Sequence, residues 1–236
     1  MNTIIMFAAA LLPVALLLLY ILKKDTRPEP TGRLVKAVLW GAGMCVPAAL
    51  VEMAISMAVY NGENTTILGT TIDAFFVVAL TEEGFKLLAL WIALRKNPFF
   101  DEHFDPIVYT VCVGLGFAAI ENITYIFGEE EWLYIAIGRA LLAVPGHYAF
   151  AVIMGYYYSL YHFTDHSRRA AVLILLAPVL AHGVYDALAL GGTVDPSIAG
   201  VCFFILIWFC IKMHKFAREK IVEQVEKDSR NEDRNI

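Results

Sequence analysis

Apolar residues fall into seven long runs along the 236-residue chain, and short polar stretches separate the runs. About 20 apolar residues in a helix are enough to cross the hydrocarbon layer of a membrane. Because unpaired backbone groups are intolerable in lipid, separate runs of this length predict helices rather than open strands. The predicted spans are, approximately, residues 3–22, 37–60, 72–94, 106–127, 132–161, 170–190 and 198–213.

Composition agrees with this pattern. Hydrophobic residues make up 59% of the chain and charged residues 17%, whereas soluble domains average about 45–50% and about 25%. We therefore expect an all-α polytopic membrane protein with about seven transmembrane helices. Residues 1–213 would form one transmembrane domain, and residues 214–236 a charged cytoplasmic tail that continues the last helix and then frays.

The ends of the runs carry further signals. The first run has no basic residues before it and no clear small-residue cleavage site after it, which favours a retained helix over a signal peptide. Turn residues such as Asn61-Gly62 lie in the connections.

Basic residues outside the spans all lie on one side of the predicted membrane. The first, third and fifth connections and the tail hold every one of them, and the second, fourth and sixth connections hold none. Those three carry acids instead, among them Glu129, Glu130, Glu131 and Asp195. By the positive-inside rule, the N-terminus lies outside and the C-terminus in the cytoplasm, which requires an odd number of spans.

Ten acidic or basic residues nevertheless lie within the first six spans. A charge at the centre of a membrane helix costs about 2.5–3.5 kcal/mol, so such residues normally face the protein interior, pair with one another and mark function. They are Glu52, Asp73, Glu82, Glu83, Lys86, Glu121, Arg139, His147, His182 and Asp186.

Several of these residues are predicted to lie at a similar depth. Counted from the outer ends of their helices, Glu82, Glu121 and His182 lie about 15, 9 and 12 Å down. His147 lies about 13 Å down if its helix enters the lipid near residue 138. The four side chains are therefore predicted to lie in one layer, between the middle of the membrane and its outer face.

Spacing within the helices also favours pairs. Lys86 follows Glu82 by four residues and Glu83 by three, so it can pair with either carboxylate. Asp186 follows His182 by four residues and can orient the imidazole or join it in facing one site.

Carboxylates and histidines in a low-dielectric pocket are typical of water activation. A buried carboxylate can act as a general base, and a histidine can donate a hydrogen bond to a developing oxyanion. The same inventory suits a divalent metal such as zinc with one position left for water. The HExxH motif is absent, so a metal would be held from separate helices, by His147, His182 and Glu121. The residues therefore leave two alternatives, no cofactor or a divalent metal.

Structural roles and non-enzymatic functions are also compatible with these residues. Lys86 and its glutamates could form a structural ion pair, and Glu52 is a lone acid. Arg139 is expected near the outer interface, where it could snorkel to the surface or pair with Glu129 to Glu131. A proton- or ion-coupled transporter or a non-catalytic scaffold or immunity-type protein could hold the same acids. Against a transporter, the sequence has no internal repeat and no matched broken helices.

Five sequence features in this order resemble the PrsW family of intramembrane proteases, which belongs to the CAAX-protease superfamily. The resemblance covers roughly residues 20–212, and each of the last four features falls on its own predicted helix. The features are Arg27-Pro28-Glu29-Pro30, Glu82-Glu83-Gly84-Phe85-Lys86, Phe117-Ala118-Ala119-Ile120-Glu121-Asn122, His147, and His182-Gly183-Val184-Tyr185-Asp186.

The resemblance implies a peptidase in a prokaryotic cell membrane. PrsW-like proteins make the first cut in a membrane-anchored anti-sigma factor, on its extracytoplasmic side. The implied partners are therefore a single-pass membrane protein and membrane lipid, with no nucleic acid.

The resemblance also implies roles for particular residues. By motif position, Glu82 activates water with Glu83 as its neighbour. His182 and Asp186 match the motif that contributes oxyanion stabilisation in the prenyl-protein branch, and His147 is the remaining catalytic candidate.

The supporting residues are Lys86, Glu121 and Asn122, and two of them depart from the prenyl-protein branch. Glu121 stands where that branch has a histidine, and Lys86 replaces an arginine that lies one place later. These departures argue against a prenylated substrate. The PrsW family has been classed among metallopeptidases, while the superfamily suggests a glutamate-based mechanism that can work without metal.

Overall fold

The computed structural model describes residues 2–60 and 66–235, and every regular element in these ranges is helical. The turn expected at Asn61-Gly62 lies outside the described residues. The elements are α1 (Asn2–Leu22), α2 (Thr31–Tyr60), α3 (Ile67–Asp73), η1 (Ala74–Ala79), α4 (Leu80–Leu94), α5 (Asp105–Gly128), α6 (Trp132–Gly138), η2 (Arg139–Ala143), α7 (Val144–Ser159), η3 (Leu160–Asp165), α8 (Arg168–Val194), η4 (Pro196–Ile198) and α9 (Ala199–Asn235).

Three of the short elements, η1, η2 and η3, are π-helical turns. The first joins α3 to α4, the second joins α6 to α7, and the third continues α7 at its C-terminal end, so the described chain forms seven long helical rods. Six rods are long and apolar enough to cross a membrane. The remaining rod, residues 67–94, has the length but carries Asp73, Glu82, Glu83 and Lys86. The expected all-α polytopic membrane fold is confirmed, and its acid-rich rod is the one that bears the predicted catalytic glutamates.

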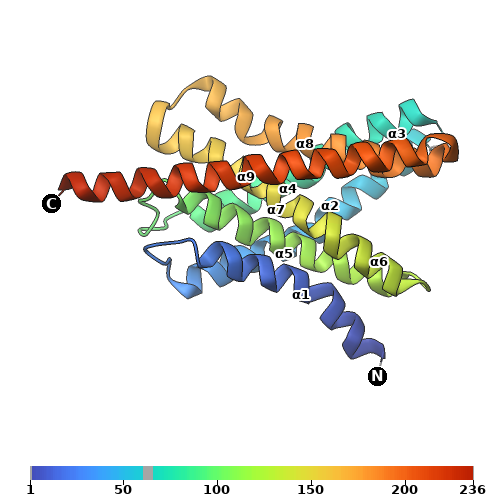
Figure 1. The fold of residues 1–236 in the computed structure, drawn as a ribbon, viewed down its shortest axis with the longest axis horizontal. Coiled ribbons are helices and arrows are strands. Elements are labelled where there is room, and N and C mark those ends of the chain that lie inside the picture. The colour runs from blue at the N-terminus through green and yellow to red at the C-terminus, as the bar shows by residue number, and fades with distance from the viewer. Residues whose placement is uncertain (1, 61–65, 236) are drawn as a thin grey trace.

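The rods run back and forth, so the two termini lie at opposite ends of the bundle (Figure 1). The α1–α2 and α4–α5 connections, the start of α8 and the C-terminus of α9 share one end, which we call the basic end. The α5–α6 connection and Asp195 lie at the other end, the acidic end. Sorting of charge along the sequence thus corresponds to sorting in space.

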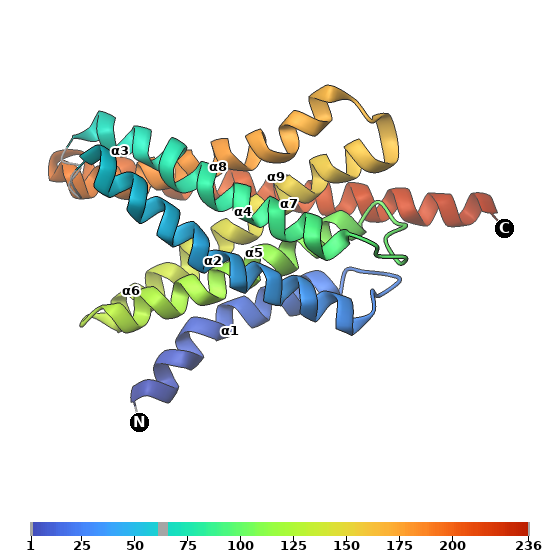
Figure 2. The ribbon, with the colours of Figure 1, turned by 180° about the vertical axis from the view of Figure 1, so that it is seen from behind.

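Among the six candidate membrane spans α5 is the most buried, and it packs against α1, α2, α4 and α7 (Figure 2). Its contact with α2 depends on two glycines. A Cβ on Gly41 of α2 would lie 2.0 Å from the carbonyl oxygen of Val113, and one on Gly116 of α5 would lie 2.2 Å from that of Val38. Each helix therefore presents a glycine to the backbone of the other, which is how membrane helices approach closely.

The C-terminal part of α9 packs onto the basic end of the bundle. The helix continues to Asn235, so no fraying is present in the described part of the tail. Gln224 is buried and accepts a hydrogen bond from Ser159 Oγ at 3.0 Å. The Asp228 carboxylate accepts from the backbone N–H groups of His103 at 2.8 Å and Phe104 at 2.9 Å, which satisfies donors at the start of α5.

Polar contacts also join the first and third connections at the basic end. Arg27 pairs with Glu102, and Tyr109 of α5 donates a hydrogen bond to Glu29. Burial raises the pKa of Glu102 to about 7 and also raises that of Glu29. The motif at residues 27–30 therefore has a structural part in this fold, away from the predicted catalytic residues.

Replacing Gly41 with alanine should destabilise the protein, because the new methyl group would overlap the backbone of α5. Overpacking of this kind costs about 1–3 kcal/mol in the free energy of unfolding. The matched control is Gly43→Ala on the same helix, where a Cβ meets nothing within 4 Å. Thermal unfolding of the purified protein in detergent should show a lower Tm for Gly41→Ala alone. Equal Tm values for the two variants would contradict the close α2–α5 contact.

Candidate active site

Two of the π turns come just before predicted site residues. The N–H of Leu80 donates to the carbonyl of Phe75, and the N–H of Val144 donates to that of Arg139, each five residues back. The second turn has a cause in the sequence, because Pro145 has no N–H to continue a regular ladder. Such turns shift the faces of a helix and are frequent at functional sites. Here they change the direction in which the preceding residues point.

Close contact between the acid-rich rod and α8 depends on another glycine. A Cβ on Gly183 would lie 2.4 Å from the ring of Phe75 in η1. The ring therefore packs directly on the backbone of α8, next to His182. This contact holds the two helices that carry the predicted base and the predicted oxyanion donor close together.

The ammonium group of Lys86 lies at the centre of the buried polar cluster. Lys86 Nζ is 2.9 Å from Glu82 Oε2, 2.8 Å from Glu83 Oε1 and 3.0 Å from His147 Nδ1. An ammonium has three N–H donors, and the three contacts use all of them. Both ion pairs expected from the spacing form within α4, and the lysine also reaches a second helix, α7. The ring of Phe117 lies beneath the ammonium, with its centroid at 4.5 Å.

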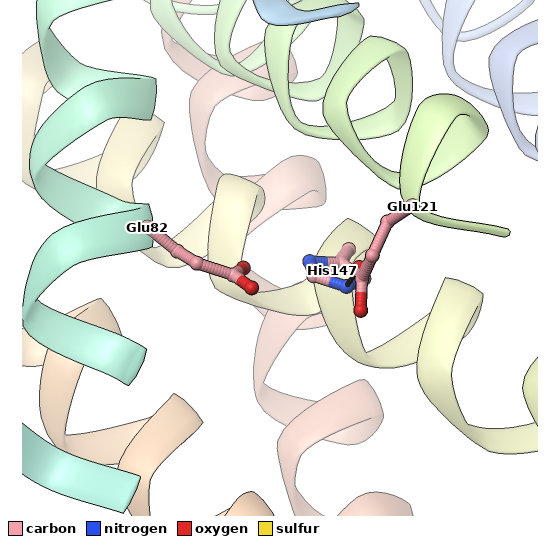
Figure 3. A group of neighbouring side chains, drawn as sticks. All are labelled: Glu82, Glu121 and His147. Carbon is pink, nitrogen blue, oxygen red and sulfur yellow. Dashed lines mark ion pairs between the residues drawn. The ribbon is translucent and has the colours of Figure 1, made fainter. Parts of the chain in front are cut away.

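A chain of polar contacts continues from Lys86 across α7 and α5. His147 Nδ1 faces Lys86, so the ring accepts there and carries its proton on Nε2. His147 Nε2 lies 2.7 Å from Glu121 Oε2, and the other oxygen of Glu121 lies 2.9 Å from Arg139 Nη2. Figure 3 shows Glu82 reaching toward His147 and Glu121 from the opposite side of the site. Positive and negative groups therefore alternate through the cluster.

His182 occupies the other flank of the glutamate pair. Its Nδ1 lies 3.0 Å from Glu83 Oε1, while its Nε2 lies 3.2 Å from Asp186 Oδ2 and 3.9 Å from Glu82 Oε2. A carboxylate oxygen can only accept, so an imidazole with carboxylates at both nitrogens is stabilised as a donor at both. Phe150 stacks on the ring at 4.6 Å and fixes its plane.

Asn122 and Arg139 form the outer boundary of the cluster. Arg139 Nε donates to Asn122 Oδ1 at 2.6 Å, and Asn122 Nδ2 donates to the carbonyl of Ala10 in α1 at 3.0 Å. The expected pairing of Arg139 with Glu129 to Glu131 is wrong, because the guanidinium contacts Glu121 and Asn122 instead. The guanidinium also lies over the ring of Tyr125, at 4.2 Å.

Two predicted intramembrane acids lie beside this cluster. Glu52 on α2 is close enough to interact electrostatically with Glu82 and Glu121, and its Oε1 is buried without a hydrogen-bond partner among the described residues. Asp73 at the end of α3 interacts electrostatically with Asp186. Among the described contacts, neither acid forms a hydrogen bond or an ion pair with Lys86.

The donor atoms can be tested for their fit to a metal ion. Within the described residues, two groups bring three possible ligand atoms within 4.8 Å of one another, Glu82 with Glu121 and His147, and Glu82 with Glu83 and His182. Each group offers two carboxylates and one imidazole, which are donor types that zinc accepts. The expected set of His147, His182 and Glu121 is not one of these groups, because each histidine joins a different one. Lys86 contacts members of both groups.

Comparison with known proteins shows the family to which the chain belongs. The model of a family described as PrsW family intramembrane metalloprotease matches residues 29–211. The chain belongs to the PrsW family of intramembrane proteases. All eight site residues named from the sequence lie in the matched range. Family membership makes the protein a multi-pass membrane peptidase and decides against the transporter and scaffold alternatives.

Several relatives named Protease PrsW are similar over nearly their whole length. The one from Clostridioides difficile (strain 630) is 35% identical over 210 residues, which cover 86% of this chain and 87% of the relative. The one from Oceanobacillus iheyensis is 32% identical over 212 residues, covering 89% and 94%. The one from Bacillus subtilis (strain 168) is 32% identical over 216 residues, covering 90% and 94%. No solved structure matches the chain significantly.

The inward position of Arg139 could not be read from helical spacing. In a regular α-helix, residues eight apart point about 80° away from each other. The π turn η2 adds roughly one residue to the turn that follows Arg139, so Arg139 and His147 come to within about 20°. Both can then reach Glu121. Pro145 was the one signal in the sequence that could have suggested an irregular turn.

The ion pair between Glu121 and Arg139 should show strong energetic coupling, because both side chains are largely buried, at 17% and 12% exposure. A double-mutant cycle of Glu121→Gln and Arg139→Gln should give a coupling free energy of about 1–3 kcal/mol. The matched control is the exposed pair Glu226 and Arg230, where the coupling should be about 0.5 kcal/mol or less. Unfolding in mixed micelles measures both cycles. Equal coupling free energies in the two pairs would contradict a buried ion pair between Glu121 and Arg139.

Proposed function

We propose that this protease cuts a single-pass membrane protein with water activated by Glu82. The buried pair Glu82 and Glu83 on α4 supports this proposal. Lys86 forms an ion pair with both carboxylates, and histidines from α7 and α8 lie beside them. A peptide carbonyl that enters this cluster would meet a carboxylate base and an imidazole donor together. Those are the two groups that peptide-bond hydrolysis by water needs.

Burial supports Glu82 rather than Glu83 as the base. Glu83 is 0% exposed, and one of its oxygens contacts both Lys86 and His182. Glu82 keeps 6% exposure, so its carboxylate retains access to an entering water. In the proposed step, Glu82 takes a proton from water while the water oxygen bonds to the carbonyl carbon. Glu82 then returns the proton to the leaving amine as the C–N bond breaks.

The two histidines have different proposed roles. His182 Nε2 faces Glu82 Oε2 at 3.9 Å. Its contact with Asp186, at 3.2 Å, is longer than the 3.0 Å contact between Nδ1 and Glu83. It is therefore placed to donate a hydrogen bond to the oxyanion. Both nitrogens of His147 are engaged, one by Lys86 and one by Glu121. His147 would act mainly as a positioning residue that orients Lys86 and, through it, the glutamate pair.

A divalent cation is compatible with the donor types at this site. The residues that would hold it are Glu82 with either Glu121 and His147 or Glu83 and His182. When bound, such an ion would polarise water and the scissile carbonyl. The ammonium of Lys86 would then stand beside the ion, which makes the lysine the residue that controls cation binding.

The proposed substrate and orientation follow from the charge pattern. The basic end would face the cytoplasm, and the acidic end the outside. Glu121 lies seven residues from the acidic end of α5, or about 10 Å along the helix. Cleavage would thus fall toward the outer face, as in a site-1 cut of a membrane-anchored anti-sigma factor or a similar single-pass protein.

Glu82→Gln should reduce cleavage of a co-expressed single-pass substrate by roughly 100-fold or more, because an amide cannot take a proton from water. Immunoblotting of substrate and product against time measures the rate. The matched control is Glu129→Gln, which removes the same charge from an exposed position at the acidic end. Cleavage at the wild-type rate by a stably inserted Glu82→Gln protein would disprove the proposal.

Replacing Lys86 with methionine should strengthen zinc binding, because the ammonium that competes for the same carboxylates is removed. Calorimetric titration with zinc and thermal unfolding in its presence measure this effect. The double variant Lys86→Met with Glu82→Gln is the control, since Glu82 belongs to both ligand groups. If zinc affinity does not rise in Lys86→Met, or rises equally in the double variant, these groups are not a cation site. Elemental analysis of active wild-type protein then shows whether a metal is bound in the working enzyme.

A further inference from the structure

A second polar site lies at the basic end, between α2 and the end of α4. It is a cavity of about 610 Å³ whose polar lining comes from three cations, Arg33 and Lys36 of α2 and Arg95 just after α4. Its apolar lining includes Leu39, Trp40 and Ile92. From Glu82 to Arg95 is 13 residues, or about 20 Å along α4, so this cavity is separate from the candidate active site.

The three cations of this cavity have no acidic partner in the part of the chain that the structure describes. Among the described residues, neither Arg33, Lys36 nor Arg95 has a carboxylate oxygen within 4.0 Å. The guanidinium of Arg95 lies over the ring of Trp91, 5.2 Å from its centroid. Like charges gathered at one cavity repel one another, and a bound anion relieves that repulsion.

Another cavity, of about 330 Å³, lies between α7, α8 and α9. It is lined by Arg169 and Lys220, but Lys220 already pairs with Glu223 at 2.8 Å. One of its two cations is therefore neutralised within the protein. The cavity between α2 and α4 is the one whose positive charge is left for a ligand.

The apolar walls indicate what kind of anion would bind. Leu39 and Trp40 are 64% and 42% exposed and belong to the outer surface of a transmembrane helix, which faces lipid. The cavity is therefore cationic at its polar end and open to acyl chains along its side. Tryptophan is enriched at the level of lipid headgroups, and basic pockets between membrane helices bind anionic headgroups.

We propose that this cavity binds the phosphate group of an anionic phospholipid, with Arg33, Lys36 and Arg95 on the phosphate and the acyl chains against Leu39, Trp40 and Ile92. The chemistry that is recognised is a phosphate anion, and the attached acyl chains distinguish a lipid from free phosphate. The proposal is independent of the reaction at Glu82.

The test is a titration of purified protein, in neutral detergent, with short-chain phosphatidylglycerol. The variant is Arg33→Gln, Lys36→Gln and Arg95→Gln together. Each basic residue near an anionic lipid contributes about fivefold in affinity, so the triple variant should bind roughly 100-fold more weakly than wild type. Native mass spectrometry of the bound lipid gives a second measurement of the same loss.

The matched control removes three charges elsewhere on the same end, Lys23→Gln, Lys24→Gln and Arg168→Gln, all exposed residues outside this cavity. It should keep wild-type affinity. Equal loss in the two triple variants would overturn the proposal, because general charge would then explain binding. A variant with Arg33→Lys and Arg95→Lys keeps the charges and should retain most of the affinity, which guards against a folding defect in the glutamine variant.

Two further titrations identify the ligand. Phosphatidylcholine of the same chain length should bind far more weakly than phosphatidylglycerol, and equal affinity would overturn recognition of an anion. Inorganic phosphate should compete only weakly, since it lacks the apolar part. If it competes as strongly as the lipid, the site takes free phosphate and the lipid proposal fails. Absence of phosphatidylglycerol binding in the wild type would also overturn it.

Discussion

The ammonium of Lys86 is the group on which the rest of the cluster depends. It pairs with both Glu82 and Glu83 and contacts His147 with its third N–H donor, so it joins α4 to α7 inside the bundle. Buried carboxylates without compensation cost several kcal/mol each. Lys86, together with His182, therefore compensates the burial of the two glutamates.

Close backbone packing makes this arrangement possible. Gly41 and Gly116 bring α2 against α5, and Gly183 brings α8 against the π turn that precedes Glu82. A larger residue at any of these positions would move helices apart by more than a hydrogen bond tolerates. Membrane helices gain little from burying apolar side chains, so small residues and polar contacts carry much of the packing. In this protein the glycines set the distances between the helices, and these distances bring the charged side chains within contact of one another.

Charge is separated in two ways in the same bundle. Inside, cations and carboxylates alternate from Arg139 through Glu121 to Lys86 and on to Glu82, the proposed base. At the basic end, Arg33, Lys36 and Arg95 are left without carboxylates among the described residues, so they attract anions from outside the protein. Internal compensation would thus serve the proposed chemistry, and uncompensated charge the proposed binding of an anionic lipid.

The sequence by itself determined the helical class, the approximate spans and the pairs that lie within one helix. Apolar runs must be helical in lipid, and spacings of three or four residues bring side chains onto one face, as at Glu82 and Lys86. The identity of the cluster was also accessible, since charges in membrane spans are costly enough to be informative. Only the tertiary structure decided which helices meet. It placed Arg139 inward through a π turn, assigned His147 and His182 to different flanks of Glu82, and joined the tail to α5 through Asp228. These outcomes depend on contacts between residues far apart in the chain and on irregular turns, and neither leaves a periodic signal in the sequence.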